Sequence, residues 1–272
     1  MRPRSTTIRR VLVDSLPSGK GSSSVPLSEE EHLHLVSVLR MSDGEAVEIL
    51  DGEGRFAAGI LELRKKSASV AVDATTIKTS DEPRPPLVLE AAILKGDAMD
   101  WLIEKCVELG VRSIRPIISA HTVVRIGDRK GPEEFRERWQ RLADQSLKQC
   151  GRKFRLRVEA PVSLETLMTA PLGATESRFW LNEASRAESP HLIAQCQDPQ
   201  VRGHTFRILL GPEGGFSYAE RELLERDPGV HSTSLGPWVL RAETAGIAAA
   251  AIAVTALLAQ TDSRGESHHG KT

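Results

Sequence analysis

The chain has 272 residues, 40% of them hydrophobic and 27% charged, so it is long and apolar enough to bury a substantial core. Its three cysteines are far apart and form no CxxC pair, which argues against a disulfide scaffold and a zinc ribbon. A net charge of −1 excludes a protein that coats nucleic acid over its whole surface.

The first eighty residues carry short β-strand patterns. Ser28, followed by Glu31, forms a capping box that predicts a helix up to about residue 40. The turn Asp51-Gly52-Glu53-Gly54 indicates a hairpin. Strands are expected over residues 8–13, 46–50, 55–63 and 68–77. This pattern predicts a small β-barrel domain over residues 1–80.

A proline-rich linker over residues 80–86 follows, and consecutive prolines interrupt both helix and sheet. We therefore place a domain boundary there and expect a second domain over residues 81–261. The polar residues 262–272 are expected to form a disordered tail.

Strands and helices alternate in the second domain. Strands are expected over 87–94, 113–118, 154–158, 178–182, 206–210 and 230–235. Helices are expected over 97–109, 132–150, 163–169, 188–197, 217–226 and 242–260. This alternation predicts an α/β fold, with a mostly parallel sheet and helices on both of its faces.

Positive charge is concentrated in residues 112–157, which hold 13 Lys and Arg against 5 Asp and Glu. Such a block is typical of a phosphate-binding surface. It is equally typical of a solvated helix face with charged loops, and the charge count alone does not separate the two.

A glycine-rich loop, Gly211-Pro212-Glu213-Gly214-Gly215, joins a predicted buried strand to a helix that Ser217 and Glu220 cap. Ligands of open α/β sheets bind at the carboxyl ends of strands, and glycine lets the backbone approach a ligand closely. The loop is neither a Walker A loop nor a dinucleotide fingerprint. A tight structural turn is the alternative interpretation.

A second loop over residues 235–241 joins the next strand to the next helix. That helix consists of small residues almost all round, which predicts burial. Arg241 and Glu243 at its entrance then need partners, because an unpaired buried charge is costly. The Ala-rich stretch 245–259 is shorter than the roughly 20 apolar residues that span a bilayer, and no signal peptide is evident. We therefore expect a cytoplasmic protein without membrane association.

Other candidates for chemistry are weaker. His32 and His34 are two residues apart on a predicted helix and do not share a face, so no metal site is expected. Cys106 lies on an apolar helix face and is expected in the core. The acidic residues Asp97, Asp100, Glu104 and Glu108 are expected on a solvated helix face.

Together the two loops make the sequence resemble the family of 16S rRNA (uracil-N3) methyltransferases, within the SPOUT superfamily of knotted, S-adenosylmethionine-dependent enzymes. Further matching blocks lie in the same order along the chain: Ile8 to Val13, His32-Leu33, Val38-Leu39-Arg40, Asp51 to Gly54, Lys95, Ile103 to Val111, Pro116, Gln145-Ser146 and Gly151-Arg152. Two departures stand out. Lys153-Phe154-Arg155 replaces a stretch where a proline is expected, and Pro237-Trp238 stands where a basic or small residue is common.

The resemblance implies a PUA-like RNA-binding barrel, a C-terminal SPOUT domain with a trefoil knot, and a homodimer. It implies S-adenosylmethionine as cofactor and 16S rRNA, either free or within the small ribosomal subunit, as substrate. The implied cofactor residues are Leu181, Leu210, Gly211, Pro212, Glu213, Gly215, Leu235, Gly236, Val239 and Leu240. The basic residues expected to contact RNA are Arg9, Arg10, Arg40, Arg125, Arg129, Lys130 and Arg152.

Methyl transfer from a sulfonium needs no metal, because the cofactor supplies the reactive group. We expect Arg241 to stabilise negative charge that develops on the uracil. Glu213 is expected to accept the N3 proton. The alternative is an Arg–Glu pair that only holds the fold together.

Two other functions remain open at this point. One is a non-catalytic RNA-binding factor in ribosome assembly, which would use the same barrel and basic block. The other is a nucleotide-dependent transferase with phosphate on the glycine-rich loop, although the Walker lysine is absent.

Overall fold

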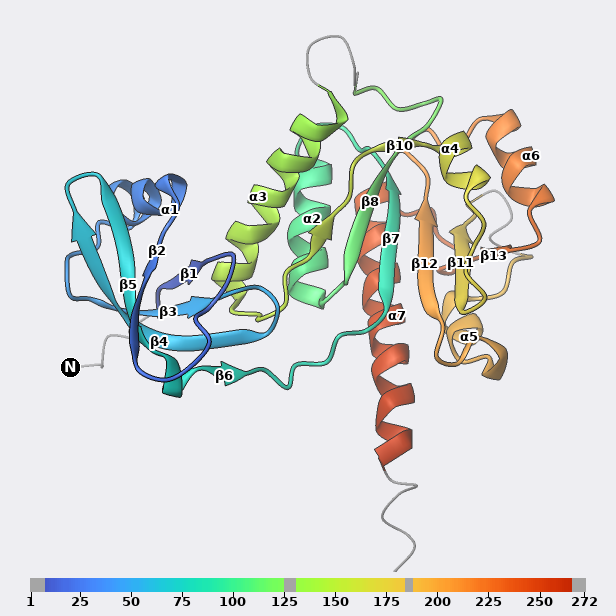
Figure 1. The fold of residues 1–272 in the computed structure, drawn as a ribbon. Coiled ribbons are helices and arrows are strands. Elements are labelled where there is room, and N and C mark those ends of the chain that lie inside the picture. The colour runs from blue at the N-terminus through green and yellow to red at the C-terminus, as the bar shows by residue number, and fades with distance from the viewer. Residues whose placement is uncertain (1–7, 125–130, 184–187, 266–272) are drawn as a thin grey trace, which may run out of the picture. The chain divides into compact units, whose positions relative to one another are not determined.

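The computed structural model describes residues 8–124, 131–183 and 188–265 (Figure 1). The chain divides into two compact units. Unit 1 comprises Met1–Glu82 and Asp144–Arg155, and unit 2 comprises Pro83–Ala143 and Leu156–Thr272. The predicted boundary after residue 80 puts 144–155 in the second domain, whereas this segment packs with unit 1.

Unit 1 contains a sheet in the order β1-β3-β4-β5-β2, with β6 paired to β4. Its elements are β1 (Arg10–Leu12), β2 (Ser22–Pro26), α1 (Glu29–Leu33), a π-helix (His34–Val38), β3 (Ala46–Leu50), β4 (Arg55–Arg64), β5 (Ser67–Asp73), a 3₁₀ turn (Ala74–Thr76) and β6 (Lys78–Thr79). The predicted hairpin forms, because β3 and β4 pair antiparallel around residues 51–54. Alternate residues of β3, β4 and β5 are buried and form one apolar core.

Strand β2 was not predicted, and its sequence explains why. It lies at an end of the strand order and buries only Val25 of its five residues, so it has no apolar alternation. The predicted helix over 28–40 is present from Glu29 to Val38, but from His34 it is a π-helix and not an α-helix. The Ser28 side chain accepts the Glu31 N–H at 3.1 Å, as predicted. The Glu31 carboxylate pairs with Lys148 instead of completing the capping box.

The segment 144–155 is attached to the sheet of unit 1 by close contacts. The Lys153 ammonium lies 2.7 Å from a Glu48 oxygen and 4.6 Å from the centre of the Phe56 ring. Gly54 has φ +96°, and a Cβ there would lie 2.5 Å from the Phe154 ring. The segment Lys153-Phe154-Arg155 therefore packs within unit 1. This is the segment that departs from the family pattern.

Unit 2 is built on a parallel sheet in the order β10-β8-β7-β12-β11-β13, with β9 paired to β8. Its strands are β7 (Leu87–Ala92), β8 (Ser113–Ile118), β9 (Arg157–Val158), β10 (Val162–Ser163), β11 (Glu176–Leu181), β12 (Thr205–Leu210) and β13 (Val230–Thr233). Its helices are α2 (Asp97–Leu109), α3 (Pro132–Cys150, entering unit 1 at Asp144), α4 (Leu164–Thr169), α5 (Leu192–Cys196), a 3₁₀ turn (Pro199–Val201), α6 (Tyr218–Arg226) and α7 (Ala242–Gly265).

Helices cover both faces of this sheet, as predicted. Leu209 packs in an apolar cluster with residues of α4 and α6. Its neighbour Leu210 points to the opposite face, because side chains alternate along a strand, and lies against Gly246 of α7. A Cβ at Gly246 would lie 2.8 Å from Leu102 of α2, so glycine permits close packing of α2 and α7. Figure 1 shows α7 running along the sheet beside β7 and β12.

Charged side chains of neighbouring strands in this sheet form a network of ion pairs around one buried carboxylate. Glu90 of β7 is fully buried and contacts Arg178 of β11 at 2.7 Å and Arg207 of β12 at 3.1 Å. Arg207 also contacts Glu176 at 2.6 Å. Buried charges are tolerated when they are paired and hydrogen-bonded in this way.

Helix α7 is longer than expected and ends at Gly265, past the predicted end at 260. Over Ala242–Gln260 it is long and apolar enough to cross a membrane by length and composition alone, and 44% of its most apolar window is buried inside the molecule. It packs against α2, α5, β7 and β12, which is the environment of a core helix. The remainder of the predicted tail, 266–272, lies outside the described residues.

Candidate functional site

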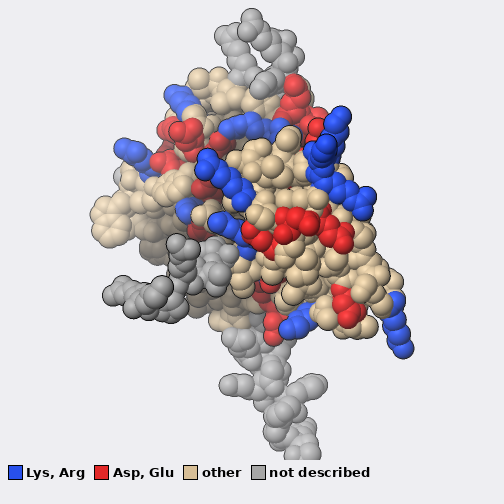
Figure 2. Space-filling view, turned by 90° about the vertical axis from the view of Figure 1, so that its left-hand side faces the viewer, with Lys and Arg blue, Asp and Glu red and all other residues tan. Residues whose placement is uncertain are grey.

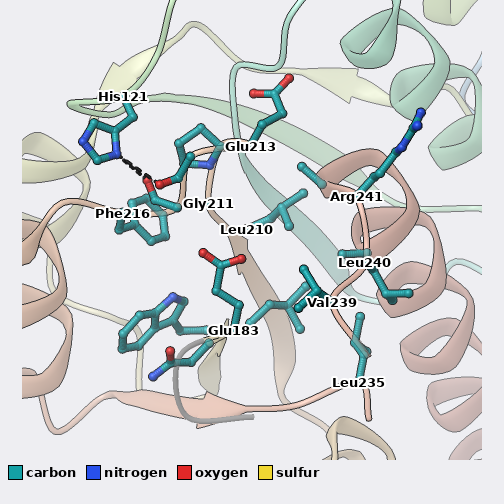
Figure 3. Close-up of a pocket in the computed structure, with 18 of the residues that line it drawn as sticks. His121, Glu183, Leu210, Gly211, Glu213, Phe216, Leu235, Val239, Leu240 and Arg241 are labelled. Carbon is teal, nitrogen blue, oxygen red and sulfur yellow. Dashed lines mark hydrogen bonds between the residues drawn. The ribbon is translucent and has the colours of Figure 1, made fainter. Parts of the chain in front are cut away.

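Loops at the carboxyl ends of β8, β11, β12 and β13 line one pocket of about 840 Å³ in unit 2 (Figure 3). Ligand pockets for small molecules span about 300–1,000 Å³. The sheet therefore presents its pocket at the edge where α/β proteins bind ligands. The lining residues include both loops that the sequence singled out, 210–217 and 235–241.

The glycine-rich loop is fixed at its end by a complete capping box. The Ser217 side chain accepts the Glu220 N–H at 3.3 Å, and the Glu220 carboxylate accepts the Ser217 N–H at 2.7 Å. This confirms the predicted cap of α6. The other Glu220 oxygen accepts the Ala120 N–H at 2.8 Å, which ties the loop after β8 to the same point. Glu220 is buried, so these bonds hold the loop rigidly.

Glycine is required where this loop meets the pocket. Gly215 has φ +67°, and a Cβ there would lie 2.4 Å from a Glu183 carboxylate oxygen. In Figure 3 the Glu183 side chain, from the end of β11, points toward the glycine-rich loop. The His121 ring Nδ1 lies 2.9 Å from the Gly215 carbonyl oxygen. Because a carbonyl only accepts, this nitrogen carries the hydrogen.

The second loop begins with a polar turn after β13. The Ser234 side chain accepts the Gly236 N–H at 3.1 Å, and Gly236 has φ +126°. The loop then leads into α7, where the Arg241 carbonyl accepts the first intrahelical bond from Ala245. Arg241 is exposed here, so the expectation that it is buried and needs a partner is wrong. The helix begins at the mouth of the pocket, where water solvates the guanidinium.

All residues that the resemblance implied for the cofactor line this one pocket, as does Arg241. They are Leu181, Leu210, Gly211, Pro212, Glu213, Gly215, Leu235, Gly236, Val239 and Leu240. The sequence analysis did not assign several other side chains that line it, among them His121, Glu183, Tyr218 and Arg221. His121 and Glu183 come three and two residues after β8 and β11, so the strand-end rule marks both positions as candidates, but it does not tell which strand ends share one pocket.

Glu213 and Arg241 do not pair with each other in the described structure. One Glu213 carboxylate oxygen accepts the backbone N–H of Lys95 at 2.9 Å, which ties the glycine-rich loop to the start of α2. The Arg241 side chain has no ion-pair partner among the described residues and extends toward the edge of the pocket (Figure 3). The alternative of an Arg–Glu pair that holds the fold together therefore has no support in this geometry.

The residues expected to contact RNA fall into three groups. Arg9 and Arg40 are exposed in unit 1, and Arg40 has φ +52° directly after the π-helix. Arg10 and Arg152 are engaged inside unit 1, with Glu48 at 2.8 Å and Glu82 at 3.7 Å. The other three, Arg125, Arg129 and Lys130, lie outside the described residues.

Most of the described cations in the basic block 112–157 form ion pairs within their own unit. Seven of these described cations contact carboxylates: Arg115, Arg136, Arg138, Lys148, Arg152, Lys153 and Arg155. On the face drawn in Figure 2, Lys and Arg side chains are interspersed with Asp and Glu. Asp100, expected to be solvated, is one of these partners and contacts Arg138.

The Cys106 thiol is not placed for chemistry, and the described residues contain no cluster of metal ligands. Burial raises the pKa of the Cys106 thiol to about 12, so it is protonated at neutral pH and packs in the core as predicted. Within residues 8–124, 131–183 and 188–265 there is no group of three or more His, Cys, Asp and Glu residues that could hold a metal ion.

A parallel sheet whose strand-end loops enclose a glycine-lined pocket defines a ligand-binding α/β protein. The family of RNA methyltransferase domains matches residues 81–254, and the family of RNA methyltransferase PUA domains matches residues 27–73. The chain therefore belongs to the RNA methyltransferase family. The prediction of a PUA-like domain followed by an α/β methyltransferase domain is confirmed, and the trefoil knot stays a prediction.

Curated relatives and solved structures agree with this assignment. The chain is 29% identical to ribosomal RNA small subunit methyltransferase E of Bacillus subtilis over 87% of this chain and 90% of the relative. It is 31% identical to the protein of the same name from Mesomycoplasma hyopneumoniae, over 63% and 70%. A Neisseria gonorrhoeae structure of that name, bound to S-adenosylmethionine, has a TM-score of 0.74 at 25% identity, covering 91% of this chain and 97% of the other.

A methyltransferase structure from Legionella pneumophila, in complex with the same cofactor, has a TM-score of 0.78 at 28% identity. It covers 93% of this chain and 98% of the other. Both units are therefore represented in these neighbours, and the similarity is not confined to the pocket.

Proposed function

We propose that the protein transfers a methyl group from S-adenosylmethionine to N3 of a uridine in 16S rRNA of the small ribosomal subunit. The observation that carries the proposal is the convergence of loops 210–217 and 235–241 on one pocket, in a chain of the RNA methyltransferase family. Two further facts support it. Curated relatives are named ribosomal RNA small subunit methyltransferase E, and two similar structures hold S-adenosylmethionine.

The pocket residues fit this cofactor chemically. Leu210, Leu235 and Val239 offer apolar surface, and the glycine-rich loop offers backbone amides, which together suit an uncharged purine ring. The carboxylates of Glu183 and Glu213 line the same pocket and suit the sulfonium and ammonium charges of the cofactor. Gly215, which has no Cβ, leaves the Glu183 carboxylate room beside the loop.

When bound, the cofactor supplies an electrophilic methyl group, and the chain's own residues must prepare the acceptor. Uracil N3 becomes nucleophilic as it loses its proton, and the negative charge spreads to the flanking oxygens. Arg241 is always protonated and can donate in a fixed fork to one of those oxygens. Glu213 uses one oxygen to hold Lys95, which leaves its second oxygen to accept the N3 proton.

The proposal includes the homodimer and the trefoil knot that the resemblance implies. It also includes RNA contacts by Arg9 and Arg40, which are exposed on unit 1. Phosphate contacts by such cations would make RNA affinity fall as salt concentration rises. We expect the pocket to bind S-adenosylmethionine whether or not RNA is present.

Calorimetry with S-adenosylmethionine tests the proposal first. We expect saturable binding without added metal, and loss of binding in Gly215→Val, where the side chain meets Glu183 and φ is positive. Gly131→Val is the control, since its Cβ would enter open space. RNA binding without cofactor binding would instead indicate an assembly factor. Binding of a nucleoside triphosphate would indicate the nucleotide-dependent transferase.

Mass spectrometry of 16S rRNA then tests the substrate. A strain lacking the gene is expected to lose one N3-methyluridine, and the purified protein is expected to restore it on that rRNA or on the small subunit. Intact modification in the deletion strain would contradict the proposed substrate even if the cofactor binds.

A further inference from the structure

The two most exposed large hydrophobic side chains of the described residues line the same pocket. Trp238 is 78% exposed and Tyr218 is 71% exposed. The chain has only four tryptophans and one tyrosine, and Trp139 and Trp180 are almost completely buried. Exposed apolar side chains gathered at a pocket mark a binding surface, since leaving them in water has a cost that packing would remove.

The backbone that carries the exposed Trp238 ring is constrained at Gly236. Trp238 follows Gly236, whose N–H is bound by the Ser234 side chain and whose φ is +126°. A Cβ at Gly236 would lie 4.0 Å from the indole, so the ring rests beside the glycine backbone. A planar aromatic side chain exposed beside a pocket is suited to stacking on another planar group, because stacking removes its apolar surface from water.

An enzyme that modifies a base must first take that base out of its stack. Unstacked bases are held on aromatic side chains, and each such contact contributes measurably to affinity. On the basis of the proposed function, we propose that Trp238 is the stacking platform for the target base of the RNA. Tyr218 and Arg221, on the same rim, complete the nucleotide site with a second aromatic ring and a cation.

A second copy of the chain is the competing occupant of this rim. The cores of subunit interfaces are depleted in charged residues. The pocket rim, in contrast, places Arg221, Arg241 and Glu243 with Trp238. The Tyr218 side chain is also partly polar, and its hydroxyl lies 3.4 Å from a carboxylate oxygen of Glu222. This mixture of aromatic rings and charges favours a nucleotide over an apolar protein surface.

The test is a double-mutant cycle on RNA binding. It uses an rRNA fragment with the mapped target uridine and the same fragment with an abasic nucleotide at that position. We expect Trp238→Ala to weaken binding of the intact fragment about tenfold, the scale of one base–aromatic stack. It should not weaken binding of the abasic fragment further, because the stacking partner is already absent. Trp238→Phe should retain most of the affinity and Trp238→Leu should not.

Trp101→Ala is the matched control, since Trp101 is 46% exposed on α2 and does not line the pocket. It is expected to leave RNA affinity unchanged. Equal losses for Trp238→Ala on both fragments would overturn the stacking proposal, as would full affinity of Trp238→Leu. A change of oligomeric mass in Trp238→Ala, measured by sedimentation, would assign the ring to a subunit interface instead. Cofactor binding and methylation by the unaltered protein, measured first, separate failure of this inference from failure of the proposed function.

Discussion

The segment 144–155 of unit 1 and the pocket rim of unit 2 each contain cations and at least one aromatic side chain, but these residues have opposite surroundings. In the segment, Lys148, Lys153 and Arg155 each contact a carboxylate within unit 1. On the rim, Arg241 is exposed and Trp238 is almost fully exposed. The cations of the segment 144–155 form ion pairs in the folded unit, whereas the exposed side chains of the pocket rim can contact a ligand.

The comparison teaches that charge density in the sequence does not identify a binding surface. The basic block 112–157 looks like an RNA-binding stretch, yet most of its described cations are satisfied inside their own unit. What separates the two regions is the partner of each charge, and partners are often remote. Lys153 and Glu48, for example, are 105 positions apart in the chain.

The largest expected effect is on the stability of unit 1, through the ion pairs of the segment 144–155. Lys153→Ala should lower the free energy of unfolding by about 3 kcal/mol, because it leaves the Glu48 carboxylate largely buried with one cation fewer. It also removes the cation over the Phe56 ring. Urea denaturation measures the loss. Lys66→Ala, on the exposed turn between β4 and β5, is the control and should change stability by less than about 0.5 kcal/mol. Equal effects of the two variants would break the comparison.

For the exposed residues of the pocket rim, we expect a substitution to change the methylation rate without changing the stability of the fold. Arg241→Ala should melt at the same temperature as the unaltered protein and bind the cofactor normally, because the side chain is exposed and unpaired in the described structure. Its single-turnover methylation rate should fall about 100-fold, the scale seen when one oriented donor to a developing charge is removed.

Arg241→Lys sharpens this test, since a lysine keeps the charge but not the fork of donors. It should also be slow. If Arg241→Ala melts far below the unaltered protein, the residue is structural and the rate assignment is wrong. Full methylation speed in a variant that melts normally would be equally decisive against it.

Much of unit 2 could be predicted because its elements are long and have clear ends. The structure has α2, β8 and α3 at the predicted residues 97–109, 113–118 and 132–150. Gly110, at φ +84°, ends α2 as its position suggested. The loop 210–217 was found because it lies between a buried strand and a capped helix. The loop 235–241 was found because it leads into a long helix of small residues, and both arrangements leave a local pattern.

Other features leave no local pattern. The strand predicted over 154–158 is reduced to β9 at Arg157–Val158, because the preceding residues pack on unit 1 instead. Arg10, predicted to bind RNA, donates to the Lys148 carbonyl 138 positions away. His121 and Glu183 reach the pocket only because β8 and β11 belong to one sheet. Such contacts depend on strand order, which periodicity in a single sequence does not reveal.

Glu213 belongs to both groups of residues, because it lines the pocket and its carboxylate also accepts the backbone N–H of Lys95. Glu213→Ala should weaken cofactor binding about tenfold, because it removes a charge-assisted hydrogen bond that positions the glycine-rich loop. Glu213→Gln keeps an oxygen that can accept the Lys95 N–H but cannot accept a proton at neutral pH. We expect calorimetry to show affinity that is only partly restored, because the loop is held again but the negative charge beside the cofactor is lost, and single-turnover assays to show a rate that stays low. Restoration of both would make Glu213 a loop tie with no role in proton transfer.

The smallest expected effect concerns a paired carboxylate inside unit 2. The Glu176 carboxylate accepts hydrogen bonds from Arg207 at 2.6 Å and from the Gly173 N–H at 3.0 Å. The hydrogen bond from Arg207 is the main reason that the pKa of Glu176 lies below its ordinary value of 4.5. A carboxyl group whose pKa is lower in the folded state stabilises the fold above its ordinary pKa.

That contribution should disappear as the pH falls below about 4.5 and through the lower pKa of the folded state, because the unfolded chain takes up the proton first. Glu176→Gln removes the titrating group, so its stability should approach that of the unaltered protein as the solution is acidified. Urea denaturation between pH 7 and pH 3 measures this difference. Glu225→Gln makes the same charge change on an exposed position of α6, and its stability should run parallel to that of the unaltered protein. If the Glu176→Gln difference stays constant over this range, the ion pair with Arg207 does not couple protonation to folding, and Glu176 behaves like the exposed carboxylate to which it is compared.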